Sequence, residues 1–282
     1  NIDFKKLDKI VTDLRLYASA FQPVKSARST KATVYGSVIA DMDMAVNGPL
    51  DALKIRGNVG LLTGTEVTYV MQDSPFALQQ QENNIVTFVS FNDSTEIAEE
   101  DTLQKSSVLG MDILVNINIA PTVKMGVNLS VDGKNRIDLQ GGGELAYTMN
   151  TLGDSRFTGR YNLTGGFVRY NPPIISEKLF KIQDGSYVSW NGDIADPQMS
   201  ITAVETVRTT ISEEEKNTRQ VNFDISIIIK NSLENLSVSF DLSAPEDLTL
   251  QNQLTSLTAE QRASQAMSLL LSLIRISEPT RL

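Results

Sequence analysis

Residues 113–131 read ILVNINIAPTVKMGVNLSV, and this stretch decides the fold class. Apolar side chains recur at every second position from Ile113 to Ile119, and again from Val123 to Val131 beyond the break at Pro121. Since successive side chains of a strand point to opposite faces, this alternation predicts strands with one apolar face and one wet face. The Asp132-Gly133 dipeptide that follows is a strong signal for a tight hairpin turn.

The same alternation extends over most of the chain. It recurs in residues 34–46, 53–61, 137–149, 221–229 and 236–242, with short turn signals between the runs. No helical periodicity interrupts the strands before about residue 258, which excludes an alternating strand-and-helix fold. The sequence therefore predicts an all-β fold built on a long antiparallel meander.

The chain divides into three predicted regions. An extended sheet is expected over residues 1–257, with polar loops at about 71–84, 92–107 and 212–220. Thr258-Ala-Glu-Gln resembles a helix capping box, and it opens an amphipathic helix predicted over 258–273. The last stretch, 274–282, fits no neighbouring pattern and is interpreted as a disordered or artefactual tail. Because the chain starts at Asn1 in mid-pattern, we expect it to be part of a longer protein.

Composition excludes several functions. The net charge of -9 disfavours nucleic-acid binding, which needs a basic face. The chain has no cysteine and no histidine, so thiolate metal sites and the usual nucleophile–histidine catalytic pairs cannot form. Asp193 and Asp196 with Glu205 could bind calcium, but turn and cap roles fit them better. We expect no enzyme activity and no cofactor.

The most specific stretch lies in residues 157–203. Asp184-Gly185 and Asn191-Gly192 are typical of type I′ turns, and they bracket a short strand rich in aromatic side chains. This stretch closely resembles the C-terminal region of the TamB family. The residues that carry the resemblance are Gly159, Arg160, Tyr161, Phe180, Ile182, Gly185, Ser186, Trp190, Gly192 and Asp193. The likeness is specific over about 140–273 and weaker over 30–137.

The resemblance implies a fold and a role. TamB-like proteins span the periplasm of Gram-negative cells as a sheet curled into a U-shaped, apolar-lined trough, with an inner-membrane anchor near the N-terminus. They are associated with phospholipid transport and outer-membrane biogenesis, together with an outer-membrane barrel of the Omp85 family, of the TamA or BamA type. By this resemblance, membrane contact is expected through parts of the protein outside this chain.

The trough also follows from the pattern itself, because the apolar stripes are long and no helices are available to cover them. An acyl chain on such a floor would gain about 0.8 kcal/mol for each buried methylene group, with no specific ligand residues. The side chains that we expect to line a lipid groove are Val115, Ile117, Ile119, Val123, Met125, Val127, Leu129, Val221, Phe223, Ile225, Ile227, Val238 and Phe240.

Three alternatives remain open at this point. The stripes could form the dry core of a closed sandwich. A β-solenoid or adhesin-like surface domain is the second alternative, although no constant repeat period is visible. An outer-membrane barrel is the third, although aromatic residues make up only 6% of the chain. Trp190 with Phe180 and Tyr187 is interpreted as a packing cluster rather than as a ligand site.

Overall fold

The computed structural model describes residues 11–29, 32–71, 110–130, 132–171, 177–213 and 217–272. Most of these residues lie in strands, and both helices follow the last strand. The elements are β1 Val11–Ser26, β2 Val34–Pro49, β3 Lys54–Leu61, β4 Glu66–Val70, β5 Asp112–Asn128, β6 Arg136–Met149, β7 Ser155–Tyr170, β8 Lys178–Ile182, β9 Tyr187–Gly192, β10 Gln198–Glu213, β11 Asn217–Ser232, β12 Ser237–Ser243, α1 Leu248–Thr255 and α2 Ala259–Ser272. The predicted all-β fold with a C-terminal helix is confirmed.

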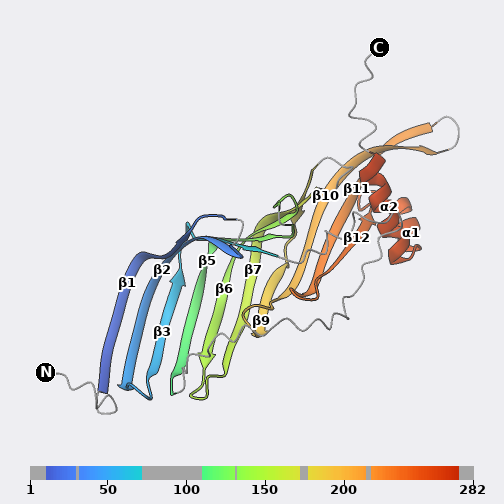
Figure 1. Ribbon diagram of the computed structural model, residues 1–282. Helices are drawn as coiled ribbons and strands as arrows, with labels where there is room; N and C mark the ends of the chain where they lie inside the picture. The colour runs from blue at the N-terminus through green and yellow to red at the C-terminus, as the bar shows by residue number, and fades with distance from the viewer. Residues whose placement is uncertain are drawn as a thin grey trace.

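All strands belong to one 12-stranded sheet that runs from β1 to β12 in nearly sequential order (Figure 1). Most neighbours pair antiparallel, as a meander requires. The exception is β5, which pairs parallel with β3 and with β4. β3, β4 and β5 therefore run in the same direction, and strand periodicity alone cannot reveal such a parallel pairing. Two predicted loops, 71–84 and 92–107, lie almost entirely outside the described residues, as does the tail 274–282.

Two positions in the sheet are each filled by a pair of short strands that lie end to end. β3 and β4 both pair antiparallel with β2, and β8 and β9 both pair antiparallel with β7. The prediction of a hairpin turn at Asp184-Gly185 is therefore wrong. The chain kinks there and continues in the same direction, because β10 and β7 hold β8 and β9 in one shared position.

A line of irregularities crosses the sheet, and we call it the corner line. It passes through Phe21, Ile39, Thr65, Pro121, Gly141, Leu163, Ser186 and Thr202. Register shifts occur on it between β1 and β2, β5 and β6, and β6 and β7. Such bulges bend strands and increase twist. Figure 1 shows β1 and β2 turning sharply partway along their length, so the sheet is folded rather than flat.

Gly141 shows how the corner is built. The triplet 141–143 lies in the middle of β6, opposite the bulge at Pro121 in β5. A Cβ atom on Gly141 would lie 2.1 Å from the carbonyl oxygen of Asn162. Only glycine permits this close approach of two backbones, and it makes a bend possible within a continuous strand.

The predicted polar loop 212–220 is shorter than expected. β10 continues to Glu213 and β11 begins at Asn217, and the register pairs Ser212 with Thr218. The long ladder between β10 and β11 continues through these polar residues and overrides their weak strand preference.

Of the two C-terminal helices, the sequence predicted α2 but not α1. The capping box at Thr258 is confirmed, since Gln261 N–H donates to Thr258 Oγ1 (3.2 Å) and Thr258 N–H donates to Gln261 Oε1 (2.9 Å). The helix α1, in contrast, was not predicted. Its N-cap is Asp247, whose side chain accepts a hydrogen bond from Leu250 N–H at 3.1 Å. The Arg219 guanidinium and this N–H hold the pKa of Asp247 below its usual value.

Candidate functional site

The largest continuous feature is the apolar inner face of the folded sheet. The strand registers place its members opposite one another from strand to strand, so they form a floor across the first half of the sheet. The floor consists of Leu14, Leu16 and Ala18 of β1, Met42, Met44 and Val46 of β2, Ile55, Val59 and Leu61 of β3, Ile113, Val115, Ile117 and Ile119 of β5, and Leu145, Tyr147 and Met149 of β6.

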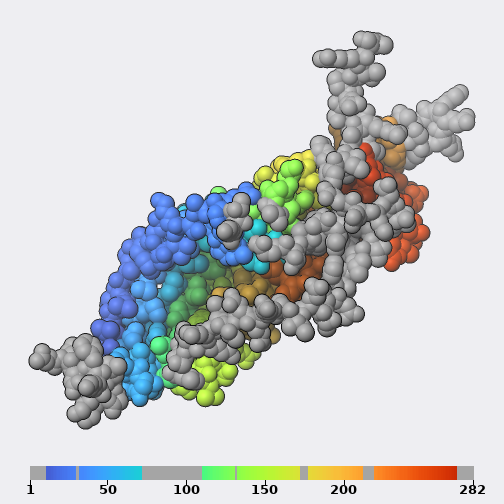
Figure 2. Space-filling model, viewed as in Figure 1, coloured from blue at the N-terminus to red at the C-terminus, as the bar shows by residue number. Residues whose placement is uncertain are grey.

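The floor is exposed at its N-terminal end and becomes buried toward the middle of the molecule. Leu16 is 45% exposed, whereas Val115 is 8% exposed. Met44 and Val59, which lie between them, are half-buried. In the space-filling view, β1 and β2 border a hollow with β3 and β5 at its base (Figure 2). The floor is therefore open over β1 to β3, where apolar atoms remain accessible.

The second half of the sheet is filled by its own side chains. The rings of Tyr170 in β7 and Phe240 in β12 lie 5.6 Å apart, although three positions of the sheet separate these strands. Burial raises the pKa of the Tyr170 hydroxyl. Ile225 in β11 is fully buried, as are Ala266 and Leu270 of α2. Curling of the sheet therefore brings inner faces into contact, and this end is a packed core.

The residues predicted to line a groove occupy both regions. Ile117, Met125 and Val127 are half-buried, and the other ten are buried. Those of β11 and β12 pack within the filled half, whereas Val115 and Ile117 belong to the floor. Sequence alternation could not indicate how far each part of this face is exposed. Their role as lining residues stays a prediction.

Two charged side chains also lie on the inner face. Lys178 of β8 lies two residues before the buried Phe180, and Glu205 of β10 lies two residues after the buried Ala203, so both share the face of these buried residues. Lys178 and Glu205 form an ion pair of 3.5 Å. The predicted turn role of Asp193 is confirmed, because its Oδ1 accepts from Ala195 N–H, two residues on. Asp196 Oδ1 instead accepts from Glu234 N–H in the turn between β11 and β12. Among the described residues, no group of acidic side chains is arranged to hold a metal ion.

The residues of the TamB-like stretch serve the corner and the packing around it. Tyr161 is fully buried, and its hydroxyl donates to the carbonyl of Val123 across β6 at 2.8 Å. Arg160 lies over the ring of Tyr187, 3.9 Å from its centroid. Trp190 packs edge-on against Phe157 at 5.5 Å, and its indole N–H donates to the carbonyl of Ile194.

The remaining members of that stretch have equally structural positions. Gly185 has a φ of +86°, and Ser186 bonds to both backbone groups of Thr202 at the corner line. Phe180 and Ile182 are buried in the core. These residues therefore form a structural scaffold around the corner line.

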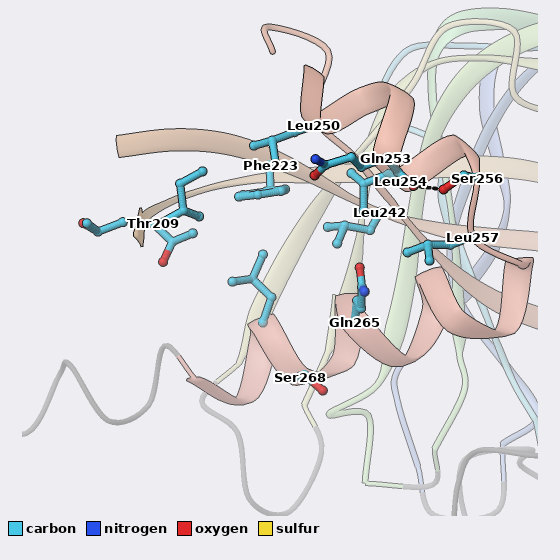
Figure 3. A pocket seen from close by; sticks show the side chains of 13 residues that line it. Thr209, Phe223, Leu242, Leu250, Gln253, Leu254, Ser256, Leu257, Gln265 and Ser268 are labelled. Atoms are coloured by element: carbon cyan, nitrogen blue, oxygen red, sulfur yellow. Dashed lines mark hydrogen bonds between the residues drawn. The ribbon is translucent and has the colours of Figure 1, made fainter. Parts of the chain in front are cut away.

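An open groove between the two helices and the sheet is a feature that the sequence did not predict. Its volume is about 690 Å³. Figure 3 shows Phe223 and Leu242 of the sheet, Leu250 and Leu254 of α1, and Gln265 of α2 around it. The leucine spacing of α1 could have indicated this wall, but the helix was too short to be recognised from periodicity.

A family model described as the TamB C-terminal domain matches residues 1–273. The chain belongs to the TamB family. None of the curated proteins compared with this chain matches it. TamB-family proteins are non-enzymatic assembly and transport modules of the Gram-negative envelope, with a role in outer-membrane biogenesis. In the described part of this TamB-family chain, neither helix is long and apolar enough to cross a membrane.

Proposed function

We propose that this TamB-family chain is part of a lipid bridge across the periplasm and that its apolar floor carries phospholipid acyl chains. The observation that carries the proposal is the exposed floor over β1 to β3, where leucine, methionine and valine side chains face a hollow. Apolar patches of this extent rarely stay open on soluble proteins unless they bind something. An acyl chain needs only continuous apolar contact, which suits a floor without polar ligands.

The proposal extends to the setting of the protein. An inner-membrane anchor outside this chain and an outer-membrane Omp85-family barrel of the TamA or BamA type would place the floor between the two membranes. The family membership supports both parts. Site-specific cross-linking from β1 to such a barrel in cells would test the partnership, and co-purification with an unrelated barrel alone would contradict it.

The experiment for lipid binding uses two neighbouring residues of β2 that face opposite sides of the sheet. Met44 lies on the floor, whereas Ala45 lies on the other face, opposite Arg15 and Arg56. A photoreactive residue at position 44 should capture lipid from vesicles of phosphatidylethanolamine and phosphatidylglycerol, and one at position 45 should capture far less. Equal capture at both positions would contradict the proposal.

A charge on the floor gives a second test. Met44→Glu places a carboxylate where an acyl chain would lie, and an unpaired charge in an apolar site costs several kcal/mol. Lipid capture by a photoreactive residue at Leu16, the register partner of Met44, should fall by more than about tenfold. Ala45→Glu is the matched control, because its carboxylate faces two arginines instead.

A scaffolding role without lipid transport is the second candidate. The filled half of the sheet between β7 and β12 favours it, since the contact of Tyr170 with Phe240 occupies the space that a lipid would need there. Unchanged outer-membrane assembly in cells that carry Met44→Glu, despite lost lipid capture, would support this role.

A further inference from the structure

The groove beneath the helices continues the inner face at the end of the sheet where the interior is otherwise filled. Ile211 and Phe223 of the sheet form one wall, and Leu250, Leu254 and Leu257 form another. Among the described residues that line the groove, none carries a charge, and the polar ones have hydroxyls or amides. The volume of about 690 Å³ lies within the range of small-ligand sites.

The turn 244–247 and the helix α2 are bonded to β11 and β12 beside the groove, which argues against a peptide strand as the occupant. Beyond Ser243, the turn 244–247 lies along β11, where Asn222 Nδ2 donates to Glu246 at 2.8 Å and Arg219 pairs with Asp247. The helix α2 packs on β12 and is fixed by Arg262, whose guanidinium donates to Asp241 at 2.6 Å. An added strand would have to displace these elements before it could reach unpaired backbone groups.

The helices are held at the rim of the groove by charged contacts, and the space beneath them is lined by leucine, isoleucine and phenylalanine side chains together with hydroxyls and amides. Val221, Phe223 and Ile225 occupy every second position of β11 and therefore lie on the same face. The groove and the packed inner face share this surface. An uncharged ligand that is apolar along its length would bury these walls without leaving a buried charge unpaired. A hydrocarbon chain meets that condition, whereas a charged peptide or a nucleotide does not.

We propose that the groove between α1, α2 and the ends of β10 to β12 binds one acyl chain of a phospholipid, as a terminal site separate from the open floor. This inference rests on the proposed function, because it takes phospholipid to be the ligand of the protein. The helices α1 and α2 then form a cap under which the chain is held, at the end where the packed core closes the interior.

The test uses phosphatidylethanolamine with a diazirine in its acyl chain, in vesicles with phosphatidylglycerol. Adducts are mapped by mass spectrometry on the whole chain. We expect adducts on α1 around Leu250 and on the floor around Met44. Ser268→Trp fills the groove and should lower the α1 adducts severalfold while the floor adducts remain. Ser264→Trp, one turn earlier on α2 and outside the lining, is the matched control.

The outcomes are distinguishable. Absence of α1 adducts, or α1 adducts that Ser268→Trp leaves unchanged, would overturn the terminal site while floor adducts still support the bridge. Loss of all adducts would overturn both proposals. Concentration-dependent dimers that Ser268→Trp abolishes would make the groove a contact between two copies and would also overturn the acyl site.

A second pair of variants provides the test if circular dichroism shows that Ser268→Trp does not fold correctly. Leu250→Glu places a charge in the groove, whereas Leu248→Glu places it on an exposed position of the same helix. The first should lower the α1 adducts and the second should not. Equal adducts in these two variants would overturn the proposal.

Discussion

Single atoms determine whether the sheet can bend, and Tyr161 is the clearest case. Its fully buried hydroxyl reaches over β6 to the carbonyl of Val123, the residue at which regular pairing with β6 resumes after the bulge. A buried carbonyl without a donor is costly, so this bond stabilises the folded form of the sheet. Burial raises the pKa of the Tyr161 hydroxyl well above its usual value of 10.0.

Tyr161→Phe should therefore lower the free energy of unfolding by about 1–3 kcal/mol. The pH dependence has a definite sign. Because the folded pKa is raised, stability from the neutral hydroxyl is complete below about pH 10 and is lost as the pH rises above it. Urea unfolding at pH 8 and pH 10.5 measures both effects. A parent chain whose alkaline loss of stability equals that of Tyr161→Phe would contradict the assignment.

Two glycines test the difference between steric contact and backbone conformation. Gly185→Ala would meet no atom within 4 Å but would keep a positive φ, which costs roughly 1 kcal/mol. Gly141→Ala would place its Cβ against the backbone of Asn162 and should cost about 3 kcal/mol. Chemical unfolding of the two variants measures the order. A larger loss for Gly185→Ala would show that the corner is not closely packed.

At the scale of elements, the position shared by β3 and β4 and the position shared by β8 and β9 are stabilised in the same way. Thr65 Oγ1 accepts from Ile39 N–H (2.9 Å) and donates to its carbonyl (3.0 Å). Ser186 Oγ accepts from Thr202 N–H (3.1 Å) and donates to its carbonyl (3.3 Å). In each case a buried hydroxyl bonds to the backbone of the neighbouring strand at the point where the kink interrupts regular strand pairing. The sheet therefore stays connected across both breaks.

Thr65→Val and Ser186→Ala should each lower the free energy of unfolding by about 1–3 kcal/mol, because each removes the acceptor of a backbone N–H of the neighbouring strand, at Ile39 and Thr202 respectively. The two corners lie about 19 Å apart along the sheet, four strand spacings of about 4.8 Å. Their effects should therefore add within about 0.5 kcal/mol. Urea unfolding of the single and double variants checks this. Strong non-additivity would mean that the corners move as one unit.

The sequence predicted the elements that depend on local pattern, and it failed where distant pairing decides. Alternation placed Ile113 to Val127 on a strand with the correct inner face, and the capping box placed the start of α2. The kink at Asp184-Gly185 looks like a hairpin turn from the dipeptide alone, because only the pairing of β8 and β9 with β7 shows that the chain does not reverse. The parallel pairing of β3 with β5 is equally invisible to periodicity.

For the whole molecule, the important property is uneven filling of one continuous sheet. The same alternation gives exposed leucines at β1 and fully buried isoleucines at β11. The two ends of the sheet differ in how strongly the sheet curls and in whether helices cover it. The alternation of apolar residues predicts neither property. The predicted lining residues therefore stay a prediction, and the strand pattern carries no information about which of them are accessible.

Hydrogen exchange should follow this filling. Amides of β7 to β12 should exchange only by global unfolding, whereas those of β1, with an exposed edge and few buried side chains, should exchange faster by local opening. Mass spectrometry of peptides from the two halves measures the difference. Lipid vesicles should slow exchange in β1 to β3 more than in the middle of β11. Uniform exchange in both halves would contradict two regions of different stability.

The end-to-end arrangement of β8 and β9 has a consequence for chain connectivity. Each of these short strands is anchored on both sides, by β7 and by β10, while the Asp184-Gly185 tip between them is exposed. The covalent link at this tip adds little to what the ladders already hold. A chain opened there should reassemble from its two halves into the native fold, so this tip is a natural place to divide the gene for complementation.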